Sequence, residues 1–218
     1  MSDVSARPAD AHLAPEESAT ARDRLLSAAI EAFAAKGFHG TTTRDIATAA
    51  GLSPAAVYVH HRSKEDLLYL ISKTGHQRTL DLVRAAAATS ADPVEQLAAV
   101  MQAFVLSHAR EHTRARIVNY ELAALAPHHL RTVAGIRRAI DAEVGAIVAA
   151  GVESGAFSTP DPHMTTLAVL SMGIDVARWF RDDGTWTGSE VADHYTVLAL
   201  RMVGVPAGRA TVRKGTGR

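Results

Sequence analysis

Two helix-start signals stand eleven residues apart in the stretch TTTRDIATAAGLSPAAVYVHHRSK, and they constrain the fold more than any other feature of the sequence. Thr42 can cap a helix whose third residue is Asp45, as in a capping box. After a glycine, Ser53 followed by Pro54 is a second start, because proline suits the first helical position. Only two or three turns fit between the two starts. The stretch therefore predicts a helix-turn-helix.

The second helix, from Pro54 to about His60, begins with small residues and ends among polar ones. Small side chains let the backbone approach a groove closely, and the start of a recognition helix is where base edges are contacted. Hydroxyl, imidazole and cationic groups suit phosphate oxygens, and those that follow here belong to Tyr58, His60, His61, Arg62 and Lys64. A surface helical hairpin with solvated charges is the alternative interpretation, since the motif alone does not establish DNA binding.

The run from Ala21 to Leu68 resembles the N-terminal DNA-binding domain of the TetR (tetracycline repressor) family without a gap. The motifs that carry the resemblance are KGF at 36–38, a threonine pair before IA at 46–47, the AGLS turn at 50–53, Tyr58, and SKEDL at 63–67. His61 is a departure, because family members commonly have an aromatic or aliphatic residue there. We therefore expect looser or more polar packing under the second helix.

The resemblance implies a regulator that binds double-stranded operator DNA as a homodimer and is released from a palindromic operator by a small molecule. It places one set of residues near bases, namely Thr43, Arg44, Pro54, Ala55 and Ala56, and a second set at phosphates, namely Tyr58, His60 and Lys64. Within these sets, Arg44 alone can bond a guanine edge in bidentate fashion. A helical adaptor that binds only protein is the alternative class.

The overall charge neither supports nor excludes nucleic-acid binding. The 218 residues are 47% hydrophobic and 21% charged, ample for a globular core, and the formal net charge is zero. Between Lys36 and Lys64, however, four lysines and arginines and three histidines stand against a single acid, Asp45. This local excess favours a polyanion. Because cysteine is absent and no apolar run reaches about 18 residues, we expect a cytoplasmic protein without disulfides or a membrane span.

Apolar residues recur at helical spacing from Ala21 onward and no segment alternates like a strand, so we expect an all-α fold. The helices are expected at about 21–36, 42–50, 54–60, 63–88 with a bend at Gly75, from 93 past 105, and at 114–125, 128–153, 162–181 and 189–203. We expect a three-helix helix-turn-helix domain at 21–66 and a larger helical ligand-binding and dimerisation domain at 67–205. The segments 1–20 and 206–218 are expected to be a disordered tail and a basic flexible tail.

The last two expected helices contain more apolar residues than one packed face needs. Small residues such as Gly173 and Ala199 would allow two helices to approach closely. Two such pairs from two chains would make a four-helix seam, and two-fold symmetry suits an inverted-repeat operator. We expect a homodimer through these helices. Burial of the same residues within one chain is the alternative.

Two C-terminal segments, RIVNYELAAL at 116–125 and SMGIDVARWFRDDGTW at 171–186, resemble TetR-family regulators of fatty-acid and sterol catabolism, whose effectors are acyl-coenzyme A thioesters. A cavity between helices is a common small-molecule site. The residues expected to line it are Met101, Phe104, Val105, Tyr120, Leu125, Met172 and Trp179. Arg137, Arg138 and Arg178 are expected to meet anionic groups of the ligand. A neutral lipophile or drug, or an ordinary core beside solvated arginines, are the alternatives.

No pattern indicates catalysis, a cofactor or a metal. The sequence has no nucleophile elbow, no glycine-rich phosphate loop and no acid pair with catalytic spacing. His108 and His112 lie four residues apart without a third ligand at metal spacing, so we interpret them as a surface pair. His128 and His129 are interpreted as solvated residues at a helix start.

Overall fold

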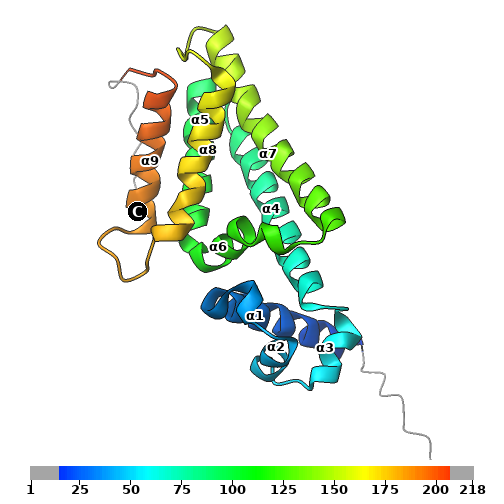
Figure 1. Cartoon of the computed structure of the whole chain (residues 1–218). Helices are drawn as coiled ribbons and strands as arrows, with labels where there is room; N and C mark the ends of the chain where they lie inside the picture. The colour runs from blue at the N-terminus through cyan, green and yellow to red at the C-terminus, as the bar shows by residue number, and fades with distance from the viewer. Residues whose placement is uncertain (1–14, 207–218) are drawn as a thin grey trace, which may run out of the picture.

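The computed structural model describes the backbone of residues 15–206 and the side chains of residues 21–206 other than Ala56. Its elements are α1 (Pro15–Gly40), α2 (Thr43–Ala49), α3 (Pro54–His60), α4 (Lys64–Ala87), α5 (Pro93–Arg110), α6 (His112–Tyr120), the 3-10 helix η1 (Leu122–Ala124), α7 (Pro127–Glu153), α8 (Pro162–Trp179) and α9 (Gly188–Met202). Helices α1 to α3 form a small unit from which α4 runs into the larger bundle of α5 to α9 (Figure 1). The predicted all-α fold is confirmed. None of the helices described is long and apolar enough to cross a membrane.

Short-range hydrogen bonds fix where several helices begin. The hydroxyl of Thr42 accepts the Asp45 N–H at 3.1 Å and the Asp45 carboxylate accepts the Thr42 N–H at 2.8 Å, which completes the predicted capping box. Ser63 caps α4 by accepting the Asp66 N–H at 3.1 Å. At α5, Asp92 is the cap and a proline follows, as predicted. Each of these interactions joins residues two or three positions apart, so it can be predicted from the sequence.

The first helix is broken at Gly37, whose φ of +69° is a value that glycine adopts without strain. Thr41 stabilises the end of α1, because its buried hydroxyl donates to the carbonyl oxygens of Gly37 at 2.8 Å and Ala32 at 3.0 Å. The chain is thereby turned sharply into α2.

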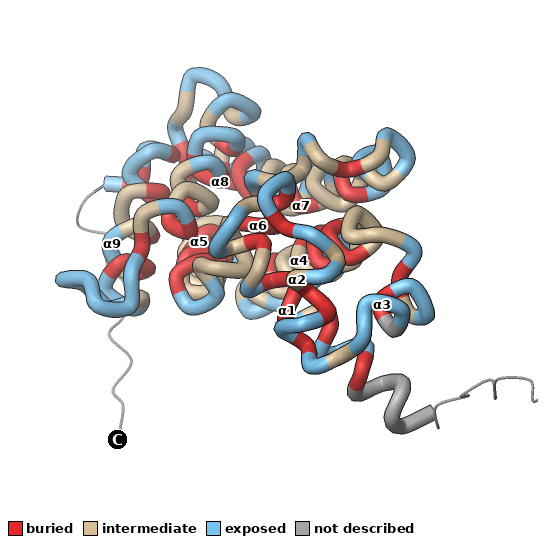
Figure 2. The backbone as a smooth tube through the Cα atoms, turned by 60° about the horizontal axis from the view of Figure 1, so that its bottom comes forward, coloured by how far each residue is buried: buried red, intermediate tan, exposed pale blue. Residues whose placement is uncertain are grey.

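Two apolar clusters hold the described chain together, and buried positions recur along each helix in Figure 2. One cluster joins α4, α5, α7, α8 and α9 around residues such as Met101 and Phe104. The other fills the helix-turn-helix unit around Phe33 and Ile46 and continues onto Ile117 of α6. The small unit is therefore packed against α6 as well as joined to α4.

Two local expectations are corrected by the structure. Helix α1 begins at Pro15, inside the segment expected to be disordered, and proline suits a first turn because it has no N–H to pair. Residues 1–14 and 207–218 lie outside the described part. The helix expected at 114–125 stops at Tyr120, and the carboxylate of the next residue, Glu121, lies 3.4 Å from the Phe38 N–H at the end of α1. Helix α4 continues through Gly75, as expected, and Gly75 is a packing position: a Cβ there would lie 2.6 Å from Val118 Cγ2.

Candidate DNA-binding surface and effector cavity

The surface formed by α2 and α3 presents most of the residues that were predicted to approach bases. Arg44, Pro54 and Ala55 are exposed, and Thr43 is half-buried. Tyr58 is 59% exposed, and its hydroxyl lies 3.3 Å from the Thr43 hydroxyl, so the two short helices are joined at their outer surface. The structure thus brings these predicted residues to one surface, while the side chain of Ala56 is outside the described part.

The ammonium group of Lys64 is not free to bind phosphate in this structure. Its ammonium donates to the carbonyl oxygens of Phe38 at 2.8 Å and Thr41 at 2.7 Å, and it lies 4.3 Å from the centre of the Phe38 ring. These contacts tie the first turn of α4 to the end of α1. The predicted phosphate ligand is therefore engaged inside the unit in this structure.

The two histidines at the end of α3, His60 within the helix and His61 directly after it, lie on its inner side. His60 is half-buried and His61 is buried, and the Nε2 atom of each has no hydrogen-bond partner among the described residues. Burial lowers the pKa of His61, and the nearby cation of Arg22 lowers it further. The position at which the sequence departs from the family that it resembles thus places a neutral imidazole in the core under α3. His60 is correspondingly less available to phosphates than Tyr58.

Five helices of the larger domain enclose a small hollow. It has a volume of about 30 Å³. Its lining combines the apolar residues Phe104, Val118, Ile140, Leu170 and Ile174 with the polar residues His76, Thr79, His108, Asn119, Arg137 and Asp141. We call this first hollow the inner hollow. A second, larger hollow of about 150 Å³ adjoins it between α4, α5 and α6. The two share Thr79, His108, Val118 and Asn119.

A hydrogen-bonded chain of three side chains forms one wall of the inner hollow. Arg137 Nη1 donates to His76 Nε2 at 3.1 Å and to Asn119 Oδ1 at 3.2 Å. The other ring nitrogen of His76 donates to the Ser72 carbonyl at 2.8 Å, which fixes a neutral tautomer. Burial, reinforced by the neighbouring Arg137 cation, lowers the pKa of His76 from 6.5 to about 4. This wall therefore carries a single positive charge, on Arg137.

His108 is also buried in this wall, which corrects its interpretation as half of a surface pair. It follows Phe104 by one helical turn on the core-facing side of α5, and its Nδ1 donates to the Phe104 carbonyl at 2.8 Å. Burial lowers its pKa, so the imidazole is neutral near pH 7. Neither sequence spacing nor composition distinguishes such a histidine from a solvated one, because the distinction depends on which face of α5 is covered.

The ten predicted effector residues are not brought together at one cavity. Phe104 and Arg137 line the inner hollow. Met101 and Val105 are buried beside Phe104 in the same core, and Met172 packs against that core. Leu125 belongs to the core of the helix-turn-helix unit, and Arg138 points to solvent. Residues of this cavity that sequence reasoning missed are His76, His108 and Asn119.

The three remaining predicted residues lie at the surface. Tyr120 and Arg178 both contact the carboxylate of Asp175. The Tyr120 hydroxyl donates to it at 3.3 Å, and Arg178 forms a two-point ion pair with it at 2.6 and 2.9 Å. This pair lowers the pKa of Asp175, with Arg178 as the main cause. Trp179 lies at a separate hollow of about 520 Å³ on the α8 and α9 side, beside Trp186 and Tyr195.

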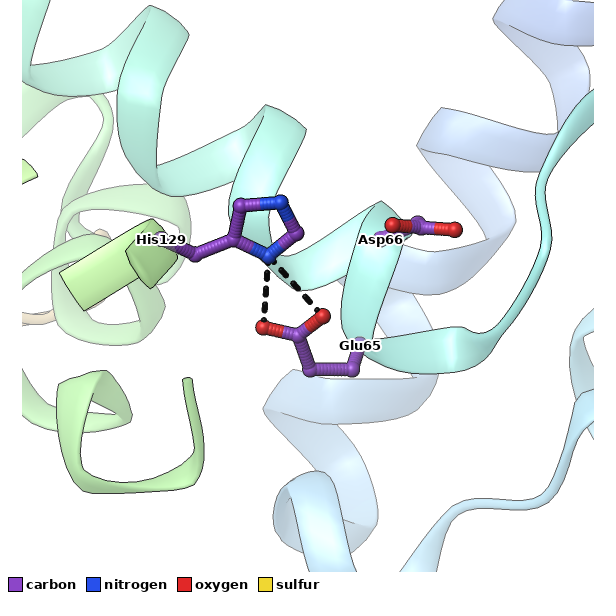
Figure 3. Close-up of side chains that lie close together, drawn as sticks. All are labelled: Glu65, Asp66 and His129. Carbon is purple, nitrogen blue, oxygen red and sulfur yellow. Dashed lines mark hydrogen bonds and ion pairs between the residues drawn. The ribbon is translucent and has the colours of Figure 1, made fainter. Parts of the chain in front are cut away.

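A polar joint connects the start of α4 to the start of α7 (Figure 3). The Glu65 carboxylate accepts the Ala126 N–H at 2.8 Å and the His129 Nδ1–H at 2.9 and 3.0 Å. The His129 ring stacks on Tyr69 with 3.7 Å between ring centres, so His129 is not the solvated residue that was expected. Helix α4 carries the helix-turn-helix unit, and this joint therefore holds that unit against the larger domain.

Asp66 lies close to this joint, and Glu65, Asp66 and His129 each place one possible metal-ligand atom within 4.8 Å of the others. Two features disfavour a cation there. The first turn of α4 carries partial positive charge from the helix dipole. The Glu65 oxygens are already occupied by two donors. We interpret the group as a hydrogen-bonded joint.

Comparisons with known proteins agree with the two structural units. Residues 25–69 match the family model described as bacterial regulatory proteins of the tetR family, and residues 90–203 match the tetracyclin repressor-like C-terminal domain. The transcriptional repressor KstR2 of Mycolicibacterium smegmatis is 26% identical over 202 residues, covering 85% of this chain and 92% of that protein.

Two solved structures are similar over most of the chain. A TetR-family regulatory protein from Rhodococcus RHA1 is 41% identical, with a TM-score of 0.82 over 85% of this chain and 98% of that one. AibR in complex with isovaleryl coenzyme A and operator DNA is 24% identical, with a TM-score of 0.76 over 82% of this chain and 97% of that one. The matched families and relatives are regulators rather than enzymes. The chain belongs to the TetR family of helix-turn-helix transcriptional regulators.

Proposed function

We propose that this regulator is a dimeric repressor, acting in the cytoplasm, that leaves a palindromic operator when a small molecule enters the hollows between α4, α5, α6, α7 and α8. The observation that carries the proposal is the Arg137 guanidinium at the wall of the inner hollow. No carboxylate lies within ion-pair distance of it among the described residues, where its partners are His76 and Asn119. A half-buried cation of this kind gains a charge-assisted hydrogen bond from an anionic or carbonyl group.

The same hollow also has apolar lining residues, among them Phe104, Leu170 and Ile174. An effector with a compact apolar group next to a polar, negatively charged part matches both kinds of lining residue. An acyl-coenzyme A thioester has this character. AibR was solved with isovaleryl coenzyme A and operator DNA. That protein shares the fold with this chain, and the fold can therefore accommodate such a ligand.

The sizes of the hollows connect effector binding to movement. Volumes of about 30 and 150 Å³ are below the roughly 300–1,000 Å³ of typical small-molecule sites. A coenzyme A thioester therefore fits only if helices separate. The helix that must move is α4 or α6, which touch closely at Gly75 and Val118. Because α4 continues into the helix-turn-helix unit, the effector would favour a different placement of α3.

The dimer surface is proposed to be the outer side of α8 and α9. The exposed large apolar side chains in this part of the chain are Met164 and Leu167 on α8, Met202 on α9 and Trp186 in the loop between these helices. Gly173 and Ala199, which were expected at the seam, are instead buried within the chain: a Cβ on Gly173 would lie 2.8 Å from the Phe104 ring. A Leu167→Asp, Met202→Asp double variant should be monomeric by light scattering and lose operator affinity. Leu130→Asp, at an exposed site on α7, is the matched control.

Selection of bound sequences from random duplex DNA, followed by release assays, tests the proposal. Acyl-coenzyme A thioesters of graded chain length and one uncharged lipophile are titrated against the protein and operator complex. We expect release by some of the thioesters. The matched variants are Arg137→Met, which should lose the response, and Arg138→Met, which should retain it because Arg138 points to solvent.

The competing function, control by a neutral lipophile or drug, predicts a different outcome. Release by the uncharged lipophile alone, with equal responses from Arg137→Met and Arg138→Met, would exclude an anionic effector at Arg137. Absence of any selected DNA would instead favour the protein-binding adaptor.

A further inference from the structure

The outward ridge of α3 is apolar at its centre. Val57 is fully buried and defines the inner side of this helix. With about 100° between successive residues, Ala55 and Val59 each lie roughly 160° away from Val57, one on either flank of the outermost line. Val59 is 76% exposed, which is the highest exposure of any large hydrophobic side chain in the part of the chain that the structure describes.

The residues beside this ridge carry the polar chemistry of the surface. Tyr58 lies on one side of it and is held by the hydroxyl of Thr43 on α2. Arg44, also exposed, extends from α2. The most protruding part of the recognition helix therefore offers methyl groups, while hydrogen-bonding groups surround it. The recognition helix of a helix-turn-helix lies in the major groove, and the outward side of α3 is the side that the rest of the protein leaves free to face it.

A valine can neither donate nor accept a hydrogen bond, so the donors and acceptors of base edges are not recognised by it. The C5-methyl group of thymine is the apolar feature that the major-groove edge of a base pair presents. We propose that Val59, seated beside Ala55, contacts a thymine methyl group in each operator half-site and is a determinant of sequence preference. This inference rests on the operator binding proposed above and adds a residue and a base to it.

Deoxyuridine substitution tests the contact without changing the protein. Each thymine of the selected operator is replaced by deoxyuridine, symmetrically in both half-sites, which removes the methyl group and leaves the Watson–Crick edge intact. One symmetric position should weaken binding by about fourfold per half-site, or about fifteenfold for the dimer, the effect expected for losing one buried methyl group at each site. Thymines outside the half-sites serve as controls.

Protein variants then assign the effect to one side chain. Val59→Ala should bind the normal operator more weakly, bind the deoxyuridine operator as wild type does, and keep the wild-type melting temperature because the site is exposed. Val59→Thr, which retains one methyl group, should keep part of the discrimination. Tyr58→Phe, on the same helix, should keep all of it.

Three outcomes would overturn the inference. In the first, deoxyuridine at every half-site thymine leaves the affinity of the wild type unchanged. In the second, the selected operator has no thymine in its half-sites. In the third, deoxyuridine weakens binding by Val59→Ala as much as it weakens binding by the wild type. Each of these leaves DNA binding itself intact. Failure to select any DNA would remove both this inference and the proposed function, so the two failures are distinguishable.

Discussion

Replacing Lys64 with methionine tests whether this lysine stabilises the fold or binds phosphate. The substitution keeps most of the aliphatic stem but removes the ammonium that donates to Phe38 and Thr41 at 2.8 and 2.7 Å. Hydrogen bonds that involve a charged group contribute about 1.5–3 kcal/mol each when they are buried. The two bonds together would then contribute about 3–6 kcal/mol, and because Lys64 is only half-buried we take roughly half of that sum, about 1.5–3 kcal/mol.

A loss of this size predicts a clear thermal effect. For a chain of this length, each kcal/mol shifts the melting temperature by about 2–4 °C, so Lys64→Met should melt about 3–12 °C lower. Arg62→Met is the matched control: Arg62 is exposed two residues earlier in the same segment and should leave the melting temperature unchanged. Circular dichroism at 222 nm is a sufficient probe because every regular element described is helical.

The salt dependence of operator binding separates the two roles. A lost phosphate contact reduces the slope of log affinity against log salt by about 0.9, and a dimer would lose two. We expect Lys64→Met to keep the wild-type slope when it is measured well below its melting temperature. An unchanged melting temperature together with a slope reduced by about 1.8 would refute the internal role and restore the phosphate contact predicted from the family resemblance.

Three further predictions concern the larger domain and its joint. Because folding lowers the pKa of His76 from 6.5 to about 4, the wild-type free energy of unfolding should be constant above pH 6.5 and should fall as the pH decreases toward 4. In urea titrations, His76→Gln should remove about 2 kcal/mol of the decrease between pH 7 and 5. Gly75→Ala should lower the melting temperature by crowding Val118, and a second change, Val118→Ala, should restore it. Glu65→Ala should cost about 1–3 kcal/mol by leaving two donors unpaired, and added Zn²⁺ should not raise the wild-type melting temperature.

The helix boundaries and the helix-turn-helix could be predicted because they depend on interactions between near neighbours. Thr42 with Asp45, Ser63 with Asp66, and Asp92 before a proline are complete within three residues, so the sequence contains all of their chemistry. The same holds for Gly37, where a turn requires positive φ. For this reason the helix-turn-helix and the membership of the TetR family could be predicted from the sequence.

The sequence could not decide which face of each helix is covered, because that depends on partners far along the chain. Arg137 and Arg138 are adjacent and chemically identical, yet only Arg137 reaches the cavity, where residues of α4 and α6 bind it. His108 could be distinguished from a solvated histidine only once other helices covered its side of α5. Lys64 and Val59 show the same limit at the DNA surface. The ammonium of Lys64, expected to bind phosphate, is bound by the end of α1, and Val59 is the most exposed large hydrophobic residue in the described part of the chain. Helical periodicity determines which residues share a face, and only the packing of distant segments determines which face meets water, DNA or ligand.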